Sequence, residues 1–368
     1  MNDKINVVHI ITKLELGGAQ VNTVYTCENL DEKNFNAFLI TGPGGILTDR
    51  FKKKERLFIA PDLVRHINPI KDIKAFFQLR KIMKKINPHI VHTHSSKAGI
   101  IGRAAAFSLR VPVIIHSVHG FSFSKYQSFL KRTFYVTAEK LVSKITGHFV
   151  FVSNDDIGIA REKKLIKENY SLIRSGFPYK KFIGKSADTK ALRENYDLKE
   201  DDFVCGIIAP FKPQKGLFHL VEIAERVLAS GKTQKNVVFM ITGDGDLRGA
   251  IEEALKQRNI FQRFRLPGFI FDIENAIDVF DLGVSTALWE GLPQSLIQLR
   301  LKKTAVVASD IPGNREVIKQ DKNGFLVDVR DYETFAERIL YLVNNDQERE
   351  RLAVFAGEDL SPWDADYM

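Results

Sequence analysis

One carboxylate, Glu290, lies just ahead of an apolar helical segment in the stretch LWEGLPQSLIQ. The preceding LGVSTA has the apolar, β-branched composition of a strand, and Pro293 suits the first turn of a helix. Backbone N–H groups between Leu292 and Ser295 can therefore face an anion, while the Glu290 carboxylate accepts hydrogen bonds from neutral hydroxyls. The stretch predicts a ligand that carries both a diphosphate and a polyol, as a nucleotide sugar does.

Two lysines follow an apolar strand in IIAPFKPQKGL. Lys215 directly precedes Gly216, where a helix is expected to begin, and a lysine beside a helix N-terminus can bind a phosphate. The alternative is a surface loop with ordinary lysines, which fits Lys212 better than Lys215. A phosphate contact is therefore predicted at Lys215 first.

The first expected strand ends in LELGGAQ, where Gly17 and Gly18 precede a helix. Adjacent glycines let the backbone approach a ligand closely, and the helix start again offers N–H donors. A plain tight turn is the alternative. The spacing G-x-G-x-x-G is absent here, which argues against a dinucleotide-dependent dehydrogenase.

Two imidazoles, His92 and His94, alternate along one expected strand in VHTHSSKAG and so share one of its faces. This spacing allows a metal pair, but no third ligand lies at a suitable spacing in the sequence, so no metal is predicted. The strand end more simply delivers His94, Ser95, Ser96 and Lys97 to a ligand. For the two serines, helix capping is the alternative.

A further imidazole follows the next strand in VPVIIHSVHGF. His119 borders Gly120 in the expected turn, where it can donate to a sugar hydroxyl or a phosphate. His116 better fits the alternative of a packed, hydrogen-bonded core histidine.

Asp244 and Asp246 form a D-x-D in ITGDGDLR, a pattern that can hold a divalent metal on a diphosphate. Both aspartates lie between an apolar strand and an expected helix, so a turn and a helix N-cap account for them. No metal is predicted here, and Gly243 and Gly245 stay as ligand-binding candidates.

Short β-branched runs alternate with amphipathic segments along most of the chain, as in parallel sheets with crossover helices. Strands are expected at residues 5–12, 35–41, 89–94, 111–116 and 148–152, and the pattern restarts with FVCGIIAPF. Two doubly wound α/β domains are predicted, residues 1–176 and 177–345, divided near Gly176 and Pro178. Ligands bind at the carboxyl ends of such strands, where the motifs above lie.

The 368 residues are too many for one ordinary core, and 44% hydrophobic with 27% charged residues is typical of a globular chain. Cys27 and Cys205 lie far apart and form no metal or disulfide pattern, which suits a reducing cytoplasm. The apolar run at the N-terminus is too short for a signal peptide, and no window suits a membrane span. A cytoplasmic location is expected.

Charge is divided unevenly, since residues 1–180 contain 29 Lys and Arg against 14 Asp and Glu, and the rest contain 25 against 31. The basic part suggests contact with an anion: a nucleic acid, a lipid headgroup or a phosphorylated small molecule. Solvated lysine-rich helices are an equally weighted alternative for any single cluster. Residues 70–87 form a basic amphipathic segment, and 123–145 mixes aromatic with basic residues. Packing on the sheet is the better explanation for 70–87, whereas for 123–145 packing and contact with an anionic bilayer are weighed equally.

Together these motifs resemble the retaining glycosyltransferases of family 4, whose GT-B fold has two Rossmann-like domains facing a central cleft. The resemblance spans nearly the whole chain, through HTHSSKAGIIGRAAA, HSVHGF, KPQKG, ITGDGDLR, EGLPQSL and VVASDIPGNREVI. HSSKAGIIGR followed by HSVHGF is most similar to bacterial members that build capsule, O-antigen of lipopolysaccharide or other surface polysaccharides. Residues 346–368 resemble the beginning of a helix that crosses back to the first domain, which leaves open a shortened C-terminus.

The resemblance implies metal-independent transfer of a hexosyl or N-acetylhexosaminyl group, with UDP as the expected nucleotide and no cofactor. It implies that Glu290 binds donor-sugar hydroxyls, that Lys215 binds the diphosphate, and that His119 lies close to the reacting sugar; these three are the candidate catalytic residues. The donor-binding candidates are Gly17, Gly18, Lys212, Lys215, Gly243, Gly245, Glu290, Gly291, Leu292, Pro293, Gln294, Ser295 and Gln298. The acceptor-binding candidates are His94, Ser95, Ser96, Lys97 and His119.

Two positions depart from the family pattern. An arginine that the family often has five residues before the clamp lysine is Pro210 here, and Lys212 could supply the missing charge. The second glutamate of the family's Glu-x7-Glu is Gln298, whose amide accepts a hydroxyl hydrogen bond but brings no charge. Contact with the ribose at altered affinity is predicted.

The predicted function is retaining transfer of a sugar to a lipid-linked or growing glycan in surface polysaccharide synthesis, with peripheral contact at the inner face of the membrane. A UDP-GlcNAc 2-epimerase of similar fold and a catalytically weak nucleotide-sugar-binding protein are the alternatives. The epimerase is expected to have a more acidic and histidine-rich cleft, and EGLPQSL with HSSKAG argues against it. No nucleic-acid partner is expected.

Overall fold

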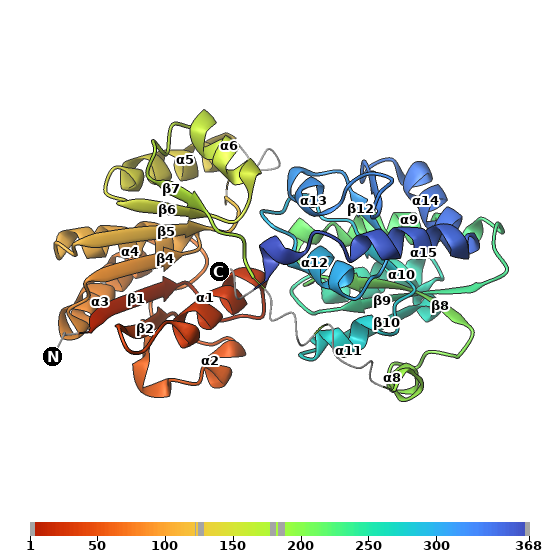
Figure 1. The fold of residues 1–368 in the computed structure, drawn as a ribbon, viewed down its shortest axis with the longest axis horizontal. Coiled ribbons are helices and arrows are strands. Elements are labelled where there is room, and N and C mark those ends of the chain that lie inside the picture. Colours follow the sequence, from red (N-terminus) through yellow and green to blue (C-terminus); the bar gives the residue numbers. More distant parts are fainter. Residues whose placement is uncertain (1–3, 122, 124–128, 177–181, 183–187, 365–368) are drawn as a thin grey trace. The chain divides into compact units, whose positions relative to one another are not determined.

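The computed structural model describes residues 4–121, 123, 129–176, 182 and 188–364. The chain divides into two compact units, Met1–Ser175 and Gly176–Met368, here called the first and the second unit. Each unit is a parallel β-sheet with helices on both of its faces (Figure 1). The predicted α/β class with two doubly wound sheets is confirmed. Pro178, named above at the domain boundary, lies outside the described residues.

Seven parallel strands form the sheet of the first unit in the order β3-β2-β1-β4-β5-β6-β7. They are β1 (Ile5–Ile11), β2 (Phe35–Thr41), β3 (Leu57–Ile59), β4 (Ile90–His94), β5 (Val113–Val118), β6 (His148–Phe151) and β7 (Tyr170–Leu172). The direction of winding reverses between β1 and β4, the place where open α/β sheets bind ligands. Strand β3 was not predicted, because three residues carry too little periodic signal.

The helices of the first unit cover opposite faces of its sheet. They are α1 (Gly18–Asn29), α2 (Leu47–Arg50), α3 (Pro69–Ile86), α4 (Ser96–Ser108), α5 (Phe129–Ser143) and α6 (Asn154–Glu162). Side chains alternate along β1, so Val8 and Ile10 pack with α3 and α4, whereas Ile11 packs with Cys27 of α1. Consequently His9, between Ile10 and Val8, lies on the α1 face of the sheet.

Six parallel strands form the sheet of the second unit in the order β10-β9-β8-β11-β12-β13. They are β8 (Asp202–Ile208), β9 (Asn236–Thr242), β10 (Phe264–Gly268), β11 (Leu282–Ser285), β12 (Val306–Ser309) and β13 (Phe325–Val327). The helices are α8 (Thr189–Asn195), α9 (Leu217–Ala229), α10 (Arg248–Gln257), α11 (Ile273–Ile277), α12 (Gln294–Leu301), α13 (Pro312–Val317), α14 (Tyr332–Asn344) and α15 (Asp346–Ala356). The winding reverses between β8 and β11, which predicts a ligand site at their carboxyl ends.

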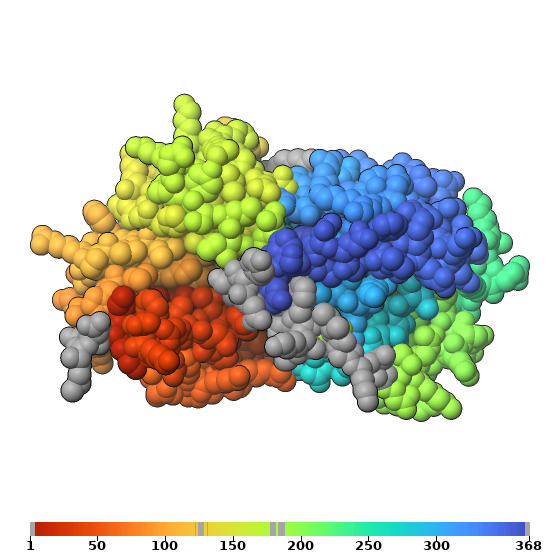
Figure 2. All heavy atoms as spheres, viewed as in Figure 1, coloured from red at the N-terminus to blue at the C-terminus, as the bar shows by residue number. Residues whose placement is uncertain are grey.

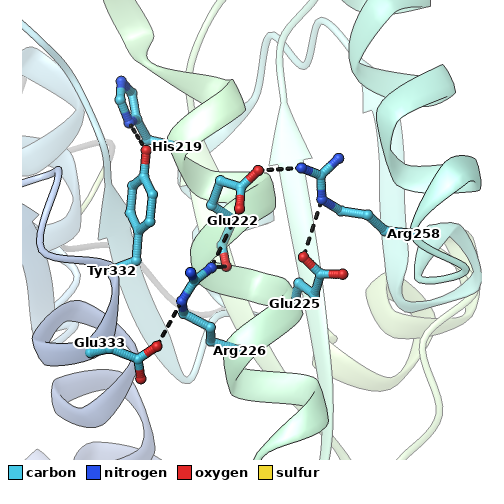
Figure 3. Close-up of polar contacts among 7 residues, drawn as sticks. All are labelled: His219, Glu222, Glu225, Arg226, Arg258, Tyr332 and Glu333. Atoms are coloured by element: carbon cyan, nitrogen blue, oxygen red, sulfur yellow. Dashed lines mark hydrogen bonds and ion pairs between the residues drawn. The ribbon is translucent and has the colours of Figure 1, made fainter.

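Helix α9 is fixed on both of its sides. Its apolar stripe, which includes Leu220 and Ala224, is buried in the core of the second unit. Its polar side carries a network of charged and aromatic residues that reaches α14 and the end of α10 (Figure 3). In this network Arg226 Nε donates to Glu333 at 2.9 Å, and Arg258 Nε donates to Glu225 at 3.2 Å. These contacts fix the position of α9, whose N-cap residue is Gly216.

The C-terminal segment belongs to the second unit. Helix α15 lies at the surface (deep blue in Figure 2) and packs on α12 and α14. The buried guanidinium of Arg300 in α12 donates to the carbonyl oxygens of Val317 and Ala356, at 3.0 Å each. Of the predicted segment 346–368, the last four residues lie outside the described part. None of the helices in the described ranges combines the length and apolar character needed to cross a bilayer.

Candidate functional site

Two residues predicted separately, Lys215 and Glu290, form an ion pair in the second unit. Their side chains are 16% and 11% exposed, so water screens this pair less than a surface pair. Gln214 Nε2 donates to the other Glu290 oxygen at 3.2 Å and to the Trp289 carbonyl at 2.9 Å. Both oxygens of the carboxylate are thus bound by one 3-10 turn, Pro213–Lys215. Sequence reasoning did not select Gln214, although KPQKG contains it.

The loops that carry this pair meet because β8 and β11 are neighbouring parallel strands. Leu288 N donates to Gln214 O at 2.8 Å, and the Thr286 hydroxyl donates to Lys215 O at 3.0 Å. Gly216 has φ of +60°, and a Cβ there would lie 2.1 Å from the Thr286 carbonyl oxygen. Only glycine therefore allows the Lys215 loop to approach the Glu290 loop this closely.

Helix α12 begins four residues after Glu290, and its N-cap residue, Pro293, makes no side-chain cap hydrogen bond. Pro293 has no N–H, so the donors of the predicted stretch are Leu292, Gln294 and Ser295 rather than every residue in it. Within the described ranges no hydrogen bond joins the Gln298 side chain to Glu290 or Lys215. The structure therefore brings together Glu290, the candidate for sugar binding, and Lys215, the candidate for phosphate binding. Gln298 lies one turn into α12.

Helix α13 supports Glu290 from a direction that sequence reasoning missed. A Cβ on Gly313 would lie 2.6 Å from the Glu290 carbonyl oxygen, so the two backbones are in close contact. Nearby, the buried Asn314 amide donates to Ser309 O at 2.8 Å, and the Ser309 hydroxyl donates to Ala287 O at 2.5 Å. In the sequence, the Pro-Gly-Asn of VVASDIPGNREVI could have indicated this contact. Its asparagine connects the ends of β11 and β12 through Ser309.

The candidates Gly243 and Gly245 lie in a loop that packs against the end of β8. Their φ angles are +144° and +156°. Added Cβ atoms would lie 2.2 Å from the Ala209 carbonyl oxygen and 2.8 Å from that of Phe211. Both glycines thus serve close backbone packing beside the Lys212–Lys215 loop.

The aspartates of the same loop act in a turn and do not cap a helix. Asp244 Oδ1 accepts from Gly245 N at 2.7 Å, and its other oxygen lies 3.5 Å from Arg248. Helix α10 begins at Arg248 and has no side-chain cap, so the predicted N-cap is wrong. The physical reason is that Leu247 occupies the cap position and both aspartates precede it.

In the first unit, His94 and His119 lie side by side at the ends of β4 and β5. His94 Nδ1 is 3.2 Å from His119 Nε2, and His94 Nε2 is 3.1 Å from His9 Nδ1. His9 was missed because INVVHII reads as a plain apolar strand, and only the register of β1 with β4 sets it opposite His92. No third ligand lies at a suitable spacing in the sequence, but the fold brings one ring nitrogen of each of His9, His92 and His94 within 4.8 Å of the others.

These imidazoles are held in the neutral form. Burial lowers the pKa of His9 and of His119 to about 4. For His92 and His94, burial together with the neighbouring imidazoles lowers the pKa well below 6.5. At neutral pH the cluster therefore offers lone pairs and N–H donors without charge.

The loop between β4 and α4 has a strained backbone at Ser95, with φ of +60° and ψ of 156°. Its side chain does not cap α4, as had been the alternative, but lies 2.8 Å from the Thr12 hydroxyl. Thr12 Oγ1 accepts from Ala98 N at 3.2 Å and so takes the place of the cap. Such strain in a non-glycine residue is typical of ligand-binding loops.

Two further candidates have clear local roles. Lys97 forms an ion pair with Asp72 of α3 at 2.5 Å, so an acceptor would have to compete with this carboxylate. Gly17 precedes α1 in an extended conformation, and a Cβ there would meet only the flexible end of Gln20. Packing therefore does not require glycine at residue 17.

Known families match both units. Residues 16–178 match the family described as Glycosyltransferase Family 4, and residues 188–358 match the family described as Glycosyl transferases group 1. The chain is 30% identical over 351 residues to an Escherichia coli protein named UDP-Gal:alpha-D-GlcNAc-diphosphoundecaprenol alpha-1,3-galactosyltransferase. That match covers 94% of this chain and 89% of the relative.

Two other relatives extend the comparison. One is the Campylobacter jejuni N,N'-diacetylbacillosaminyl-diphospho-undecaprenol alpha-1,3-N-acetylgalactosaminyltransferase, 26% identical over 306 residues, with 81% of this chain and 79% of the relative covered. The other is the crystal structure of Anabaena Alr3699/HepE with UDP and glucose, which has a TM-score of 0.84 at 16% identity. It covers 98% of this chain and 96% of that one, and at this identity the likeness concerns the fold alone.

Proposed function

The chain is a glycosyltransferase of family 4 with the GT-B fold, and from this premise we propose that it transfers a hexosyl or N-acetylhexosaminyl group from a UDP sugar to a polyprenyl-diphosphate-linked glycan. We propose retention of the anomeric configuration, as the family resemblance implies. The Escherichia coli and Campylobacter jejuni relatives act, by name, on a diphosphoundecaprenol-linked sugar, and the first of them uses UDP-Gal. Assembly of a bacterial surface polysaccharide is the process that fits this acceptor. The comparisons give the epimerase alternative no support.

The observation that carries this proposal is the contact of Lys215 and Gln214 with Glu290 beside the start of α12. A donor diphosphate would take Lys215 as its counter-ion and accept hydrogen bonds from the N-terminus of α12. Glu290, released from the lysine, would then accept hydrogen bonds from the hydroxyls of the donor sugar. One short segment thus suits both halves of a nucleotide sugar.

The proposed chemical step is a substitution on one face of the sugar. The acceptor hydroxyl oxygen forms a bond to the anomeric carbon while the bond from that carbon to the UDP phosphate oxygen breaks. The hydroxyl proton passes to the departing phosphate oxygen, and UDP leaves. Lys215 and the amides of α12 compensate the charge that develops on UDP, and such prearranged donors are often worth about 3 kcal/mol each. Because these groups supply that compensation, the transfer is proposed to need no metal.

His119 is proposed to contact the reacting sugar as a neutral imidazole. Its pKa of about 4 means that it brings hydrogen-bonding capacity without charge at neutral pH. His94, which lies 3.2 Å away, orients the ring from behind. Ser95 and the Gly17–Gly18 loop are proposed to lie near the acceptor.

Release of UDP from each of four UDP sugars (glucose, galactose and their N-acetylamino forms), with and without a short GlcNAc-diphosphate lipid, tests the function. Acceptor-dependent release is expected from at least one donor. Glu290→Gln should abolish most of it, whereas Glu253→Gln, an exposed carboxylate in α10, should not change it. Unchanged turnover in Glu290→Gln would refute the assignment of this residue. Thermal stabilisation by UDP sugars without any turnover would favour the binding-protein alternative.

Membrane contact is proposed through α5. Phe129 and Leu130 are 79% and 80% exposed, and Phe134 and Leu141 are also exposed on this helix. Arg132 and Lys140 on the same helix suit anionic headgroups. Of the predicted segment 123–145, residues 124–128 lie outside the described part. The other predicted segment, now α3, buries Ala75, Leu79, Met83 and Ile86 in the core.

Co-sedimentation with vesicles of anionic phospholipid at low salt tests this contact. The unchanged protein should bind, and a double variant Phe129→Ser, Leu130→Ser should bind at least several-fold less. Val354→Ser, which removes a comparably exposed apolar side chain from α15, is the matched control. Equal binding by all three proteins would rule out α5 as the contact.

A further inference from the structure

The first unit holds a group of imidazoles that the proposed transfer does not use in full. His9 in β1 is the register partner of His92 in β4, and His94 follows two residues later on the same face. His9 and His94 are 1% exposed, whereas His92 is half-buried. Three rings from two neighbouring strands thus converge beneath α1.

The spacing of these rings fits a metal ion. His9 Nδ1 and His94 Nε2 are 3.1 Å apart, and one nitrogen from each of the three residues lies within 4.8 Å of the others. Bonds of about 2.0–2.1 Å at tetrahedral angles place the nitrogens around Zn²⁺ about 3.3 Å apart. Small side-chain rotations would therefore bring all three nitrogens to bonding distance.

The hydrogen bonds around the rings also fit a metal. His92 Nε2 is 2.7 Å from the Ser117 hydroxyl, and His94 Nδ1 is 3.2 Å from His119. Histidines that bind metals almost always use their second nitrogen in this way, which fixes the ring and its tautomer. These contacts leave His92 Nδ1 and His94 Nε2 to act as ligands.

His9 differs from the other two rings at its second nitrogen. Its Nδ1 lies 3.1 Å from His94 Nε2, whereas its Nε2 is buried and has no hydrogen-bond partner among the described residues. His9 Nδ1 is therefore the nitrogen that this ring offers to the cluster.

We propose that His9, His92 and His94 bind one transition-metal dication of the zinc type. Three imidazoles without a carboxylate favour Zn²⁺, Co²⁺, Ni²⁺ or Cu²⁺ over Mg²⁺ and Ca²⁺, which prefer oxygen ligands. Water completes the coordination. The site belongs to the first unit, whereas Lys215 and Glu290 belong to the second, and no step of the proposed transfer runs through the metal.

Titration of untagged, chelator-treated protein with Co²⁺ tests the site, because visible absorption reports cobalt held by nitrogen ligands. One equivalent should bind, Zn²⁺ should displace it, and a large excess of Mg²⁺ should not. His9→Ala should weaken binding by more than the roughly 10- to 100-fold that loss of a supporting hydrogen bond costs. Ser117→Ala, which keeps all three ligands, should weaken it by about that 10- to 100-fold.

His116→Ala provides the matched control, because its imidazole is equally buried in the same sheet but packs against α4 near Gly99. It should keep one equivalent of Co²⁺. If His9→Ala fails to fold by circular dichroism, the Ser117→Ala titration decides alone. Binding of less than about one-tenth equivalent by the unchanged protein, or equal binding by the unchanged protein, His9→Ala and Ser117→Ala, would overturn the proposal.

Discussion

The two units place polar side chains at the same ends of their parallel strands but use opposite electrostatics. In the second unit, Lys215 and Glu290 form an ion pair. In the first unit, burial lowers the pKa of His9, His94 and His119 so that they are neutral at neutral pH, and hydrogen bonds and stacked rings join them. A departing diphosphate needs charge, whereas a hydroxyl acceptor needs only oriented donors and acceptors. On the function proposed above, recognition of the leaving group and of the acceptor would be divided between these two kinds of sites.

Removal of the lysine charge is the strongest way to test this division. Lys215→Ala should lower kcat/KM by about 100- to 1000-fold, because the charge that develops on UDP loses its counter-ion. Kinetics of UDP release measure this change. Lys235→Ala, which removes a surface lysine paired with Asp346, should stay within twofold. A loss below tenfold in Lys215→Ala would move the charged role to Lys212.

Acid should unfold the two units at different pH values. For His9 the pKa is about 6.5 unfolded and about 4 folded, so between these values the unfolded chain binds more protons. Stability is therefore complete above about pH 6.5 and falls as the pH drops towards 4, by about 3 kcal/mol for this residue alone. Five histidines of the first unit have a lowered pKa, against His219 in the second, so the first unit should unfold first; the five are His9, His92, His94, His116 and His119.

Two spectroscopic signals can distinguish the units during this titration. Trp289 and Trp363 are the two tryptophans, and both belong to the second unit. In the presence of a chelator, circular dichroism should show loss of structure at a pH where tryptophan emission is still unchanged. If circular dichroism and tryptophan emission change at the same pH, the first and the second unit unfold together.

One methyl group added at residue 313 should disrupt the site of Lys215 and Glu290 without removing a charge. Gly313→Ala would set a Cβ 2.6 Å from the Glu290 carbonyl oxygen and displace that backbone. Donor turnover should fall about 10- to 100-fold, since shifts of about 1 Å have such costs. Gly249→Ala in α10, where a Cβ meets nothing within 4 Å, should keep full turnover and raise the unfolding temperature. Equal turnover in both variants would contradict the close packing of α13.

Gln298→Glu should strengthen the binding of UDP by the second unit by a small amount. The change restores the charge of the family pattern, and a hydrogen bond to a charged acceptor is about 1 kcal/mol stronger than to a neutral one. Calorimetry should show UDP binding a few-fold more tightly. Gln257→Glu on α10 is the control, and no difference between the two variants would mean that residue 298 does not contact the ribose.

The sequence allowed the fold class and most strands to be predicted, because alternating apolar runs carry that information locally. It also placed Lys215 and Glu290 on the correct loops, since the turn residues around them are distinctive. It did not reveal Gln214 or Gly313, whose roles depend on contacts between strands far apart in the chain. His9 was hidden for the same reason: its partner His92 is set by register, and register is not written in either strand alone.

The ion pair between Lys215 and Glu290 has a consequence for turnover. If Lys215 binds the diphosphate as proposed, the carboxylate would compete for the same ammonium group before a donor arrives and again after the sugar has left. Glu290 would then favour release of UDP over its retention. Glu290→Gln should bind UDP more tightly than the unchanged protein, although it transfers no sugar, and calorimetry with UDP alone would measure the difference.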